Sequence, residues 1–167
     1  FHTEDIFEEK KGHYFIIDRK KDIYKNSRGQ TIAPQKIENL FQDFDAIKSI
    51  FLVGDGKEFN SVLIYPDYAN SPVDLKLESD KNIRDFFSSI ILSVNSFLSP
   101  YERIVNYVII NRDFSENNGE LTHKGTFIRN QVLKNFKNII DPLYEKNFIS
   151  LYHNNQEIRI PNWLTRE

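Results

Sequence analysis

Cysteine and methionine are both absent from the 167 residues of the chain. The lack of cysteine excludes a disulfide framework, a thiolate metal site and a cysteine nucleophile, and it is compatible with a cytoplasmic protein. No apolar run approaches the roughly 18–20 residues of a membrane-spanning helix, and no charged-then-apolar leader is visible. Because the chain begins at Phe1 rather than at methionine, we expect it to be a piece of a larger protein.

An excess of charge of either sign is also missing. The chain has 22 Lys and Arg against 24 Asp and Glu, for a net charge of −2. This balance excludes a broadly cationic nucleic-acid binder, although it leaves room for a local basic patch. Hydrophobic residues make up 40% and aromatic residues 14%, enough for a folded core and too many for a disordered chain.

Known catalytic and metal-binding patterns are equally scarce. The sequence has no phosphate-binding G-x-x-x-x-G-K-[ST] loop, no H-E-x-x-H and no G-x-S-x-G. The histidines lack the spacing of metal ligands, so no metal site is predicted. They stand at His2, His13, His123 and His153.

Three segments carry apolar residues at helical spacing. The first opens at Pro34, whose fixed φ suits a first helical turn. The second has the strongest period in the chain; it follows a cap at Ser79 or Asp80 and ends near Pro100. The third runs from about residue 126 to residue 140. The stripes are Ile37, Leu40, Phe41 and Phe44; Ile83, Phe86, Phe87, Ile90, Ile91, Val94 and Phe97; and Ile128, Val132, Phe136, Ile139 and Ile140.

Strand signals lie between these helices. Residues 47–53 and 61–65 flank a Gly-Asp-Gly turn and predict a hairpin, and residues 105–110 predict a third strand. Residues 66–80 and 111–125 are polar and predict loops. The order αββαβα therefore predicts an α+β domain with a small three-stranded sheet and packed helices.

Two shorter hairpins are expected outside this domain. Residues 14–17 and 23–25 predict a hairpin around a charged bend, and residues 148–152 and 157–160 suggest another in the tail. We accordingly divide the chain into a hinge and hairpin segment (1–32), the α+β domain (33–144) and a tail (145–167).

The chemistry that the chain offers lies in three polar clusters. In the first, the carboxylate of Asp5 can accept both hydroxyls of a ribose, and Arg19 can donate to the same diol or to a phosphate. In the second, Gly29 would let a backbone or a thin ligand approach closely. In the third, Lys124 stands in a polar, glycine-containing loop and can reach a distant anion. Each cluster taken alone is read more simply as a solvated turn or loop.

Together, in this order and spacing, the clusters resemble the C-terminal domain of the adenylate-forming acyl-CoA synthetases, in particular the long-chain fatty-acid–CoA ligase branch. The segment 15–38, which reads FIIDRKKDIYKNSRGQTIAPQKIE, is similar to the signature that follows the hinge of that family. The segment 3–5 resembles the family's Thr-Gly-Asp, with Glu4 in place of glycine. The resemblance covers about residues 1–137.

The resemblance implies a role for each matching residue. Asp5 matches the carboxylate that binds the ribose, and Arg19 matches an arginine that contacts the nucleotide. Lys21 falls at the hinge between the two domains of the family. Gly29 matches a glycine that lines the pantetheine tunnel, and Lys25 matches a lysine that acts in the thioester-forming orientation.

The resemblance also implies a catalytic lysine that brings positive charge to the α-phosphate during adenylation. In the long-chain branch this lysine lies three residues before a basic residue, a register that here puts Thr126 before Arg129. Lys124 lies two residues earlier. Either a shifted loop delivers Lys124 or the loop differs; we assign the role to Lys124 because no other lysine is near.

The function implied is that of the mobile C-terminal domain of an ATP-dependent fatty-acid–CoA ligase, inactive as an isolated fragment. ATP and CoA are the implied substrates, with Mg²⁺ accompanying ATP in the full-length enzyme and no cofactor expected on this fragment. The implied partner is an N-terminal adenylation domain, with no nucleic acid and no transmembrane segment. The implied location is cytoplasmic, with peripheral membrane association left open.

Three other readings stay open at this point. A carrier-protein thiol could replace CoA as the acceptor. Alternatively, the basic segment 18–28 could dock an acidic partner in a non-catalytic binding module. The tail could also lead into a fused enzyme domain beyond Pro161.

Overall fold

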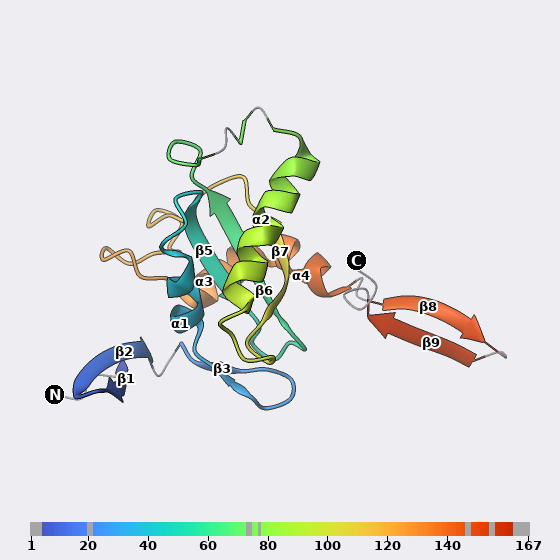
Figure 1. Cartoon of the computed structure of the whole chain (residues 1–167), viewed down its shortest axis with the longest axis horizontal. Helices are drawn as coiled ribbons and strands as arrows, with labels where there is room; N and C mark the ends of the chain where they lie inside the picture. Colours follow the sequence, from blue (N-terminus) through green and yellow to red (C-terminus); the bar gives the residue numbers. More distant parts are fainter. Residues whose placement is uncertain are drawn as a thin grey trace.

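A three-stranded sheet lies at the centre of the structure (Figure 1). Its strands stand in the order β5 (Ile47–Val53), β6 (Asn60–Pro66) and β7 (Ile104–Ile109). The first two are antiparallel, whereas β6 and β7 are parallel, with helix α2 (Asp80–Asn95) in the crossover. The computed structural model describes residues 5–19, 22–72, 75–76, 78–145, 148–153 and 156–161.

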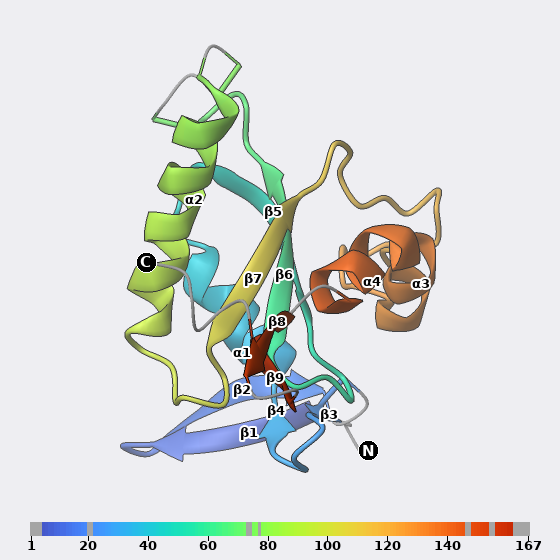
Figure 2. The same ribbon diagram turned by 90° about the vertical axis from the view of Figure 1, so that its right-hand side faces the viewer.

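Both faces of this sheet are buried. Side chains alternate along each strand, so that Leu52 and Val62 face one apolar cluster whereas Phe51 and Leu63 face another. The first cluster packs beneath α2, α1 (Pro34–Glu38) and the short 3₁₀ helix η1 (Asn39–Phe41). The second packs beneath α3 (Arg129–Asn135) and α4 (Lys137–Glu145). Figure 2 shows the resulting layers, with α2 and the α3–α4 pair on opposite sides of the sheet.

These elements confirm the predicted α+β class. The expected hairpin of β5 and β6 and the third strand are present. The predicted cap of α2 is Ser79, whose side-chain oxygen accepts a hydrogen bond from the Asn82 N–H at 3.3 Å. The parallel crossover from β6 to β7 was not predicted, because local strand pairing was expected. None of the helices in the described ranges is long and apolar enough to cross a bilayer.

The prediction that residues 14–17 pair with residues 23–25 in a hairpin was wrong. Residues 14–17 lie in β2 (His13–Arg19), which pairs with β1 (Asp5–Lys10), and residues 23–25 contribute to β3 (Tyr24–Lys25), which pairs with β4 (Thr31–Ile32). The turn between β1 and β2 contains Lys11 and Gly12, both at positive φ, the conformation that tight hairpin turns require. The tail hairpin is present as β8 (Phe148–His153) and β9 (Gln156–Pro161).

The last helix also differs from its prediction. It is two helices, separated at Phe136, and α3 begins only at Arg129. Residues 121–127 form a small hairpin instead of a first helical turn, because Leu121 bridges Phe127. Three residues of the predicted stripes are exposed as a result of such boundaries: Leu40 in η1, Phe97 beyond the end of α2, and Ile128 before α3.

A buried ion pair ties the layers together along the outer edge of β5. Arg129 at the start of α3 donates to both carboxylate oxygens of Glu38 at the end of α1, at 2.8 and 3.2 Å. The same guanidinium donates to the Leu52 carbonyl at 2.8 Å, and Glu38 accepts from the Leu52 N–H at 2.7 Å. The guanidinium also lies 4.3 Å from the centre of the Phe51 ring. This pair therefore satisfies both backbone groups of Leu52 on β5, which has no strand on its outer side among the described residues.

Replacing Glu38 by glutamine should destabilise the fold by about 3 kcal/mol, since it leaves the largely buried Arg129 charge without its counter-ion. Urea unfolding measures this loss. As a matched control, Lys137→Gln removes an i,i+4 ion pair with Asp141 in which the lysine side chain is 71% exposed, and it should cost less than about 1 kcal/mol. Equal losses in the two variants would contradict the dominant role of Glu38.

Candidate functional site

Lys124 lies at the tip of the hairpin formed by residues 121–127. The Thr122 N–H donates to the Thr126 carbonyl at 2.9 Å, and the Gly125 N–H donates back to the Thr122 carbonyl at 2.8 Å. The Thr122 hydroxyl accepts from the Thr126 N–H at 3.2 Å. Gly125 closes the turn at φ 74°, a value that favours glycine. The exposed Lys124 is thus presented by an ordered turn.

The base of this hairpin is anchored by a buried carboxylate. Glu120 is fully buried and accepts hydrogen bonds from both terminal nitrogens of Arg112, at 2.6 and 2.9 Å. It accepts further bonds from the Asn135 amide at 2.8 Å and from the Ser115 N–H at 3.0 Å. Burial acts to raise the pKa of Glu120, but these hydrogen bonds outweigh it and hold the pKa below its usual value. The carboxylate therefore stays ionised and fixes the loop from which the hairpin projects.

Lys124 and Thr126 line the same cleft, of about 460 Å³, between the hairpin, α1 and β5. Asp22, Glu38 and Arg129 line it as well. Burial acts to lower the pKa of Arg129, but the negative charges of Glu38 and Asp22 contribute to raising it overall. We call this the Lys124 cleft. The cleft combines the exposed Lys124 with the Glu38–Arg129 ion pair in its wall.

The two residues predicted to bind the nucleotide face each other across a hairpin. Asp5 and Arg19 are directly paired in the register of β1 and β2. Lys21, the predicted hinge, lies outside the described residues.

Lys25 ends strand β3, and Gly29 lies in the loop that joins β3 to β4. Buried Asn26 organises this loop: its side-chain oxygen accepts from the N–H groups of Arg28 and Gln30 at 3.0 and 2.9 Å. Gly29 has φ 78°, and a Cβ built on it would meet no atom within 4 Å. Glycine is therefore needed at this position for its backbone conformation. No described residue fills the space beside it.

The β3–β4 loop is fastened to the turn between β5 and β6. The Gly56 N–H donates to the Lys25 carbonyl, and the Ser27 N–H donates to the Lys57 carbonyl, both at 2.9 Å. The Tyr24 hydroxyl donates to the Asn60 side chain at 2.9 Å. Burial raises the pKa of Tyr24, so this hydroxyl remains a donor at neutral pH.

The loop lines a groove of about 970 Å³ on a different part of the domain from the Lys124 cleft. The other wall of the groove is formed by the start of β7 and the residues before it, including Tyr101 and Arg103. The structure thus places Lys124 and the Gly29 loop at different openings of the domain, while Asp5 and Arg19 lie on the β1–β2 hairpin. Lys124 lies with Asp22 in one cleft, and the Gly29 loop borders the other groove.

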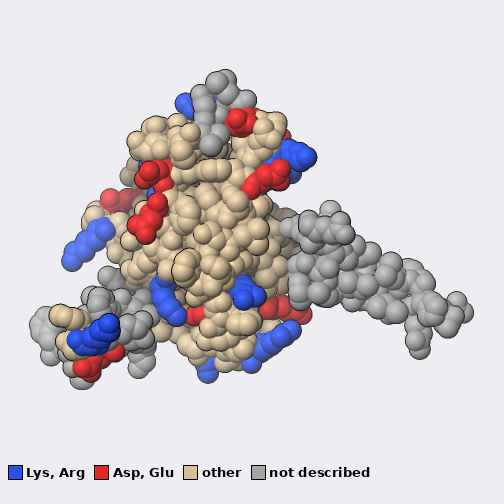
Figure 3. All heavy atoms as spheres, in the orientation of Figure 1, with Lys and Arg blue, Asp and Glu red and all other residues tan. Residues whose placement is uncertain are grey.

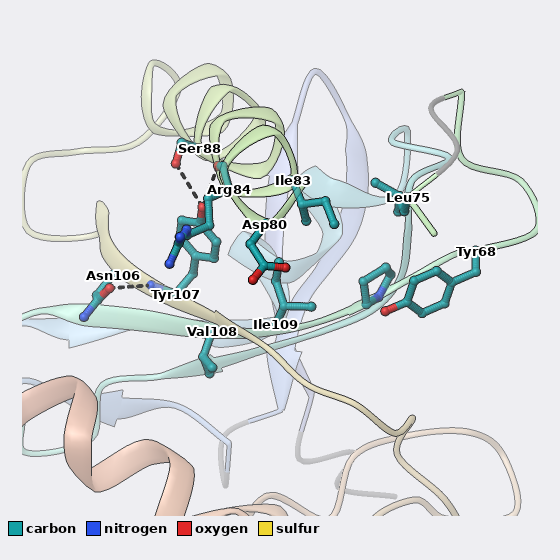
Figure 4. Close-up of a pocket in the computed structure, with 11 residues that line it drawn as sticks. Tyr68, Leu75, Asp80, Ile83, Arg84, Ser88, Asn106, Tyr107, Val108 and Ile109 are labelled. Carbon is teal, nitrogen blue, oxygen red and sulfur yellow. Dashed lines mark hydrogen bonds between the residues drawn. The ribbon is translucent and has the colours of Figure 1, made fainter. Parts of the chain in front are cut away.

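A further hollow, of about 650 Å³, lies between α2 and β7 (Figure 4). Tyr107 reaches from β7 to α2, where its hydroxyl bonds to the Ser88 hydroxyl at 2.9 Å and donates to the Arg84 carbonyl at 2.6 Å. Asp80 and Ile83 also line this hollow. It contains none of the predicted site residues.

Sequence reasoning missed the buried polar residues that position these groups. Glu120, Arg112 and Asn26 occupy polar stretches without periodicity, and Glu38 and Arg129 are 91 residues apart in sequence. A carboxylate directly after buried Ile37 was the one available signal for Glu38. In the described ranges, no three or more His, Asp or Glu side chains gather in a way that could hold a metal ion.

Comparisons with known proteins agree on one family. The model of the family "AMP-binding enzyme C-terminal domain" matches residues 21–148. The human long-chain-fatty-acid–CoA ligase 1 is 29% identical over 142 residues, which cover 77% of this chain and 20% of the ligase. The mouse long-chain-fatty-acid–CoA ligase 6 is 31% identical over 159 residues, which cover 86% and 22%. The chain thus spans about a fifth of the length of these relatives.

Solved structures show the same fold. The adenylation domain of a carboxylate reductase from Mycobacterium chelonae superposes with a TM-score of 0.69 at 19% identity, covering 86% of this chain and 23% of that one. The corresponding domain from Segniliparus rugosus, solved with AMP and a carboxylic acid, gives 0.66 at 22% identity, covering 85% and 23%. With its fold, its clusters and the family match in agreement, this chain belongs to the C-terminal domain family of the AMP-binding, adenylate-forming enzymes.

Proposed function

We propose that the chain is the mobile C-terminal domain of an ATP-dependent fatty-acid–CoA ligase. In the first half-reaction a fatty-acid carboxylate attacks the α-phosphate of ATP, which forms the acyl-adenylate and releases pyrophosphate. In the second, the CoA thiol attacks the acyl carbonyl, the thioester forms and AMP leaves. The names of the curated relatives support a long-chain fatty acid and CoA as the substrates.

The observation that carries this proposal is the separation of Lys124 and the Gly29 loop on one framework. Lys124 projects beside its cleft, whereas the Gly29 loop borders a different groove. A domain that turned one region and then the other toward a shared active site would serve the two half-reactions in sequence. Lys21 would be the hinge of this rotation, and residues 1–32 would face the large domain.

Each side chain has a task that suits its chemistry. Lys124 would place positive charge at the α-phosphate as charge redistributes in the transition state. Asp5 would accept the ribose hydroxyls, with Arg19 beside it as a donor to the nucleotide. Lys25 and Gly29 would border the path of the pantetheine arm. A carrier-protein thiol is the alternative acceptor, and one fold neighbour is a didomain of an adenylation domain with a carrier domain.

Alone, the chain should form no acyl-adenylate, because the large domain would hold the phosphate-binding loop and the acyl pocket. ATP–pyrophosphate exchange with a fatty acid should therefore stay at background. Robust exchange by the chain alone would contradict its role as one half of a two-domain site.

In the full-length enzyme, Lys124→Ala should lower the rate of adenylation by roughly 10²–10³, the usual effect of losing one transition-state charge donor. Thioester formation from preformed acyl-adenylate should change far less. Pyrophosphate exchange and single-turnover thioester formation measure the two steps separately.

Two further variants test the register of this lysine. Lys48 lines the same cleft but is held by Asp113 at 3.1 Å, so Lys48→Ala should leave adenylation within a few-fold of normal. In the Lys124→Ala background, Thr126→Lys places a lysine two residues along the same hairpin. If Lys124→Ala alone leaves exchange intact, another group supplies the charge and the assignment to Lys124 is wrong.

Gly29→Trp in the full-length enzyme should spare adenylation and slow thioester formation by about 10² or more, since a bulky side chain would obstruct the pantetheine arm. Gly29→Asn is the matched control: asparagine tolerates positive φ better than other residues and should give a smaller loss. Equal losses in both half-reactions would refute the placement of Gly29 beside the thiol path.

A further inference from the structure

The outer side of the second half of helix α2, and of the turn that follows it, lacks charge. Residues 86–101 contain no Asp, Glu, Lys, Arg or His. The inner side of this stretch is core, but its outer side is exposed to solvent. Solvent-facing helix surfaces ordinarily carry charged side chains, so this composition is unusual for a face in contact with water alone. The exposed residues are Ser89, Leu92, Ser93, Ser96, Phe97, Ser99, Pro100 and Tyr101.

Two large apolar side chains protrude from this face. Leu92 is 69% exposed and Phe97 is 78% exposed, more than any other large hydrophobic residue in the described ranges. Figure 3 shows a broad area without charged side chains over the lower part of α2. We call the exposed surface of residues 89–101 the α2 outer face. Exposed apolar surface of this kind marks a contact site more often than a chance arrangement.

The serines on this face do not depend on water for all their hydrogen bonds. The Ser89 hydroxyl donates to the Phe86 carbonyl at 2.7 Å, and the Ser96 hydroxyl donates to the Ser93 carbonyl at 2.6 Å. Such bonds within a helix lower the free energy needed to remove a hydroxyl from water. The α2 outer face can therefore enter a less polar environment at low cost.

Positive charge borders the end of this face. Arg28 and Arg103 line the groove next to the α2–β7 turn, where Glu58 is the single carboxylate among the described lining residues. The nearby Glu102 is buried and paired with Lys36 at 3.3 Å. Figure 3 shows Lys and Arg side chains, with Asp and Glu side chains among them, along the lower edge of the molecule below the uncharged area. The surroundings of the apolar tip thus complement an anionic surface.

We propose that the α2 outer face docks on a lipid bilayer with anionic headgroups. Leu92 and Phe97 insert at the level of the headgroups, and Arg103 meets lipid phosphates beside them. The helical stretch from Ser89 to Phe97 is about 14 Å long and roughly 10 Å wide. That footprint is far below the roughly 800 Å² per partner of a stable protein complex. A bilayer sets no such minimum, because each inserted side chain contributes separately.

The test is binding of the whole chain to vesicles of phosphatidylcholine with phosphatidylserine. Sedimentation should give a partition coefficient that Leu92→Ser with Phe97→Ser lowers at least about tenfold, by loss of the inserted apolar surface. Arg103→Ala, or omission of phosphatidylserine, should lower it about threefold to fivefold. In a Trp163→Phe background, Phe97→Trp should show a blue-shifted emission on the same vesicles.

Leu40→Ser is the matched control. Leu40 is 37% exposed but lies in η1 rather than on the α2 outer face. The Leu40→Ser variant should therefore bind vesicles with an unchanged partition coefficient. Absence of vesicle binding, or binding that the double variant leaves intact, would overturn the proposal. The proposal would also be overturned if the chain self-associated without lipid and the double variant abolished that self-association. In that case the α2 outer face would bind a second copy of the chain. Vesicle binding requires no ligase activity, so the two proposals can fail separately.

Discussion

The ion pair between Arg129 and Glu38 is the contact on which the arrangement of this domain depends. It joins the end of α1 to the start of α3, and between them it binds both backbone groups of Leu52 on the edge strand β5. An unpaired edge strand exposes polar groups that other chains can pair with. Here a charged pair, packed against the Phe51 ring, covers that edge. A structural contact of this kind fixes the wall of the Lys124 cleft as well.

Because the wall is fixed, the parts that would meet substrate can be small. Lys124 needs only a short turn at the end of the hairpin, since buried Glu120 holds the base of that hairpin through four hydrogen bonds. Gly29 needs only the loop that Asn26 shapes from within. Both are attached to the same sheet, and they lie at different places on it. A rigid body with two such attachments can present each one by rotating, without refolding either.

Local pattern predicted those parts of the fold that local forces determine. The period of α2 and its Ser79 cap were confirmed, as was the hairpin of β5 and β6. The pairing of β2 with β1 was missed although only a two-residue turn joins them, because the charge-rich sequence of β1 shows no sustained strand alternation. The start of α3 was missed because apolar Ile128 extends the helical pattern, whereas the network around Glu120 holds the preceding residues in a hairpin. Resemblance to a family supplied the candidate site residues, and their roles stay predictions.

The alternating use of the two regions is the central claim, and hydroxyl-radical footprinting of the full-length enzyme tests it most directly. The enzyme would be trapped once with a non-hydrolysable acyl-adenylate analogue before thiol binding, and once with an analogue that joins adenylate to pantetheine. The account predicts protection of residues 121–126 in the state trapped with the acyl-adenylate analogue, and a shift of protection to residues 25–30 in the state trapped with the adenylate–pantetheine analogue. Protection of both segments in the same state, or no change between states, would contradict it.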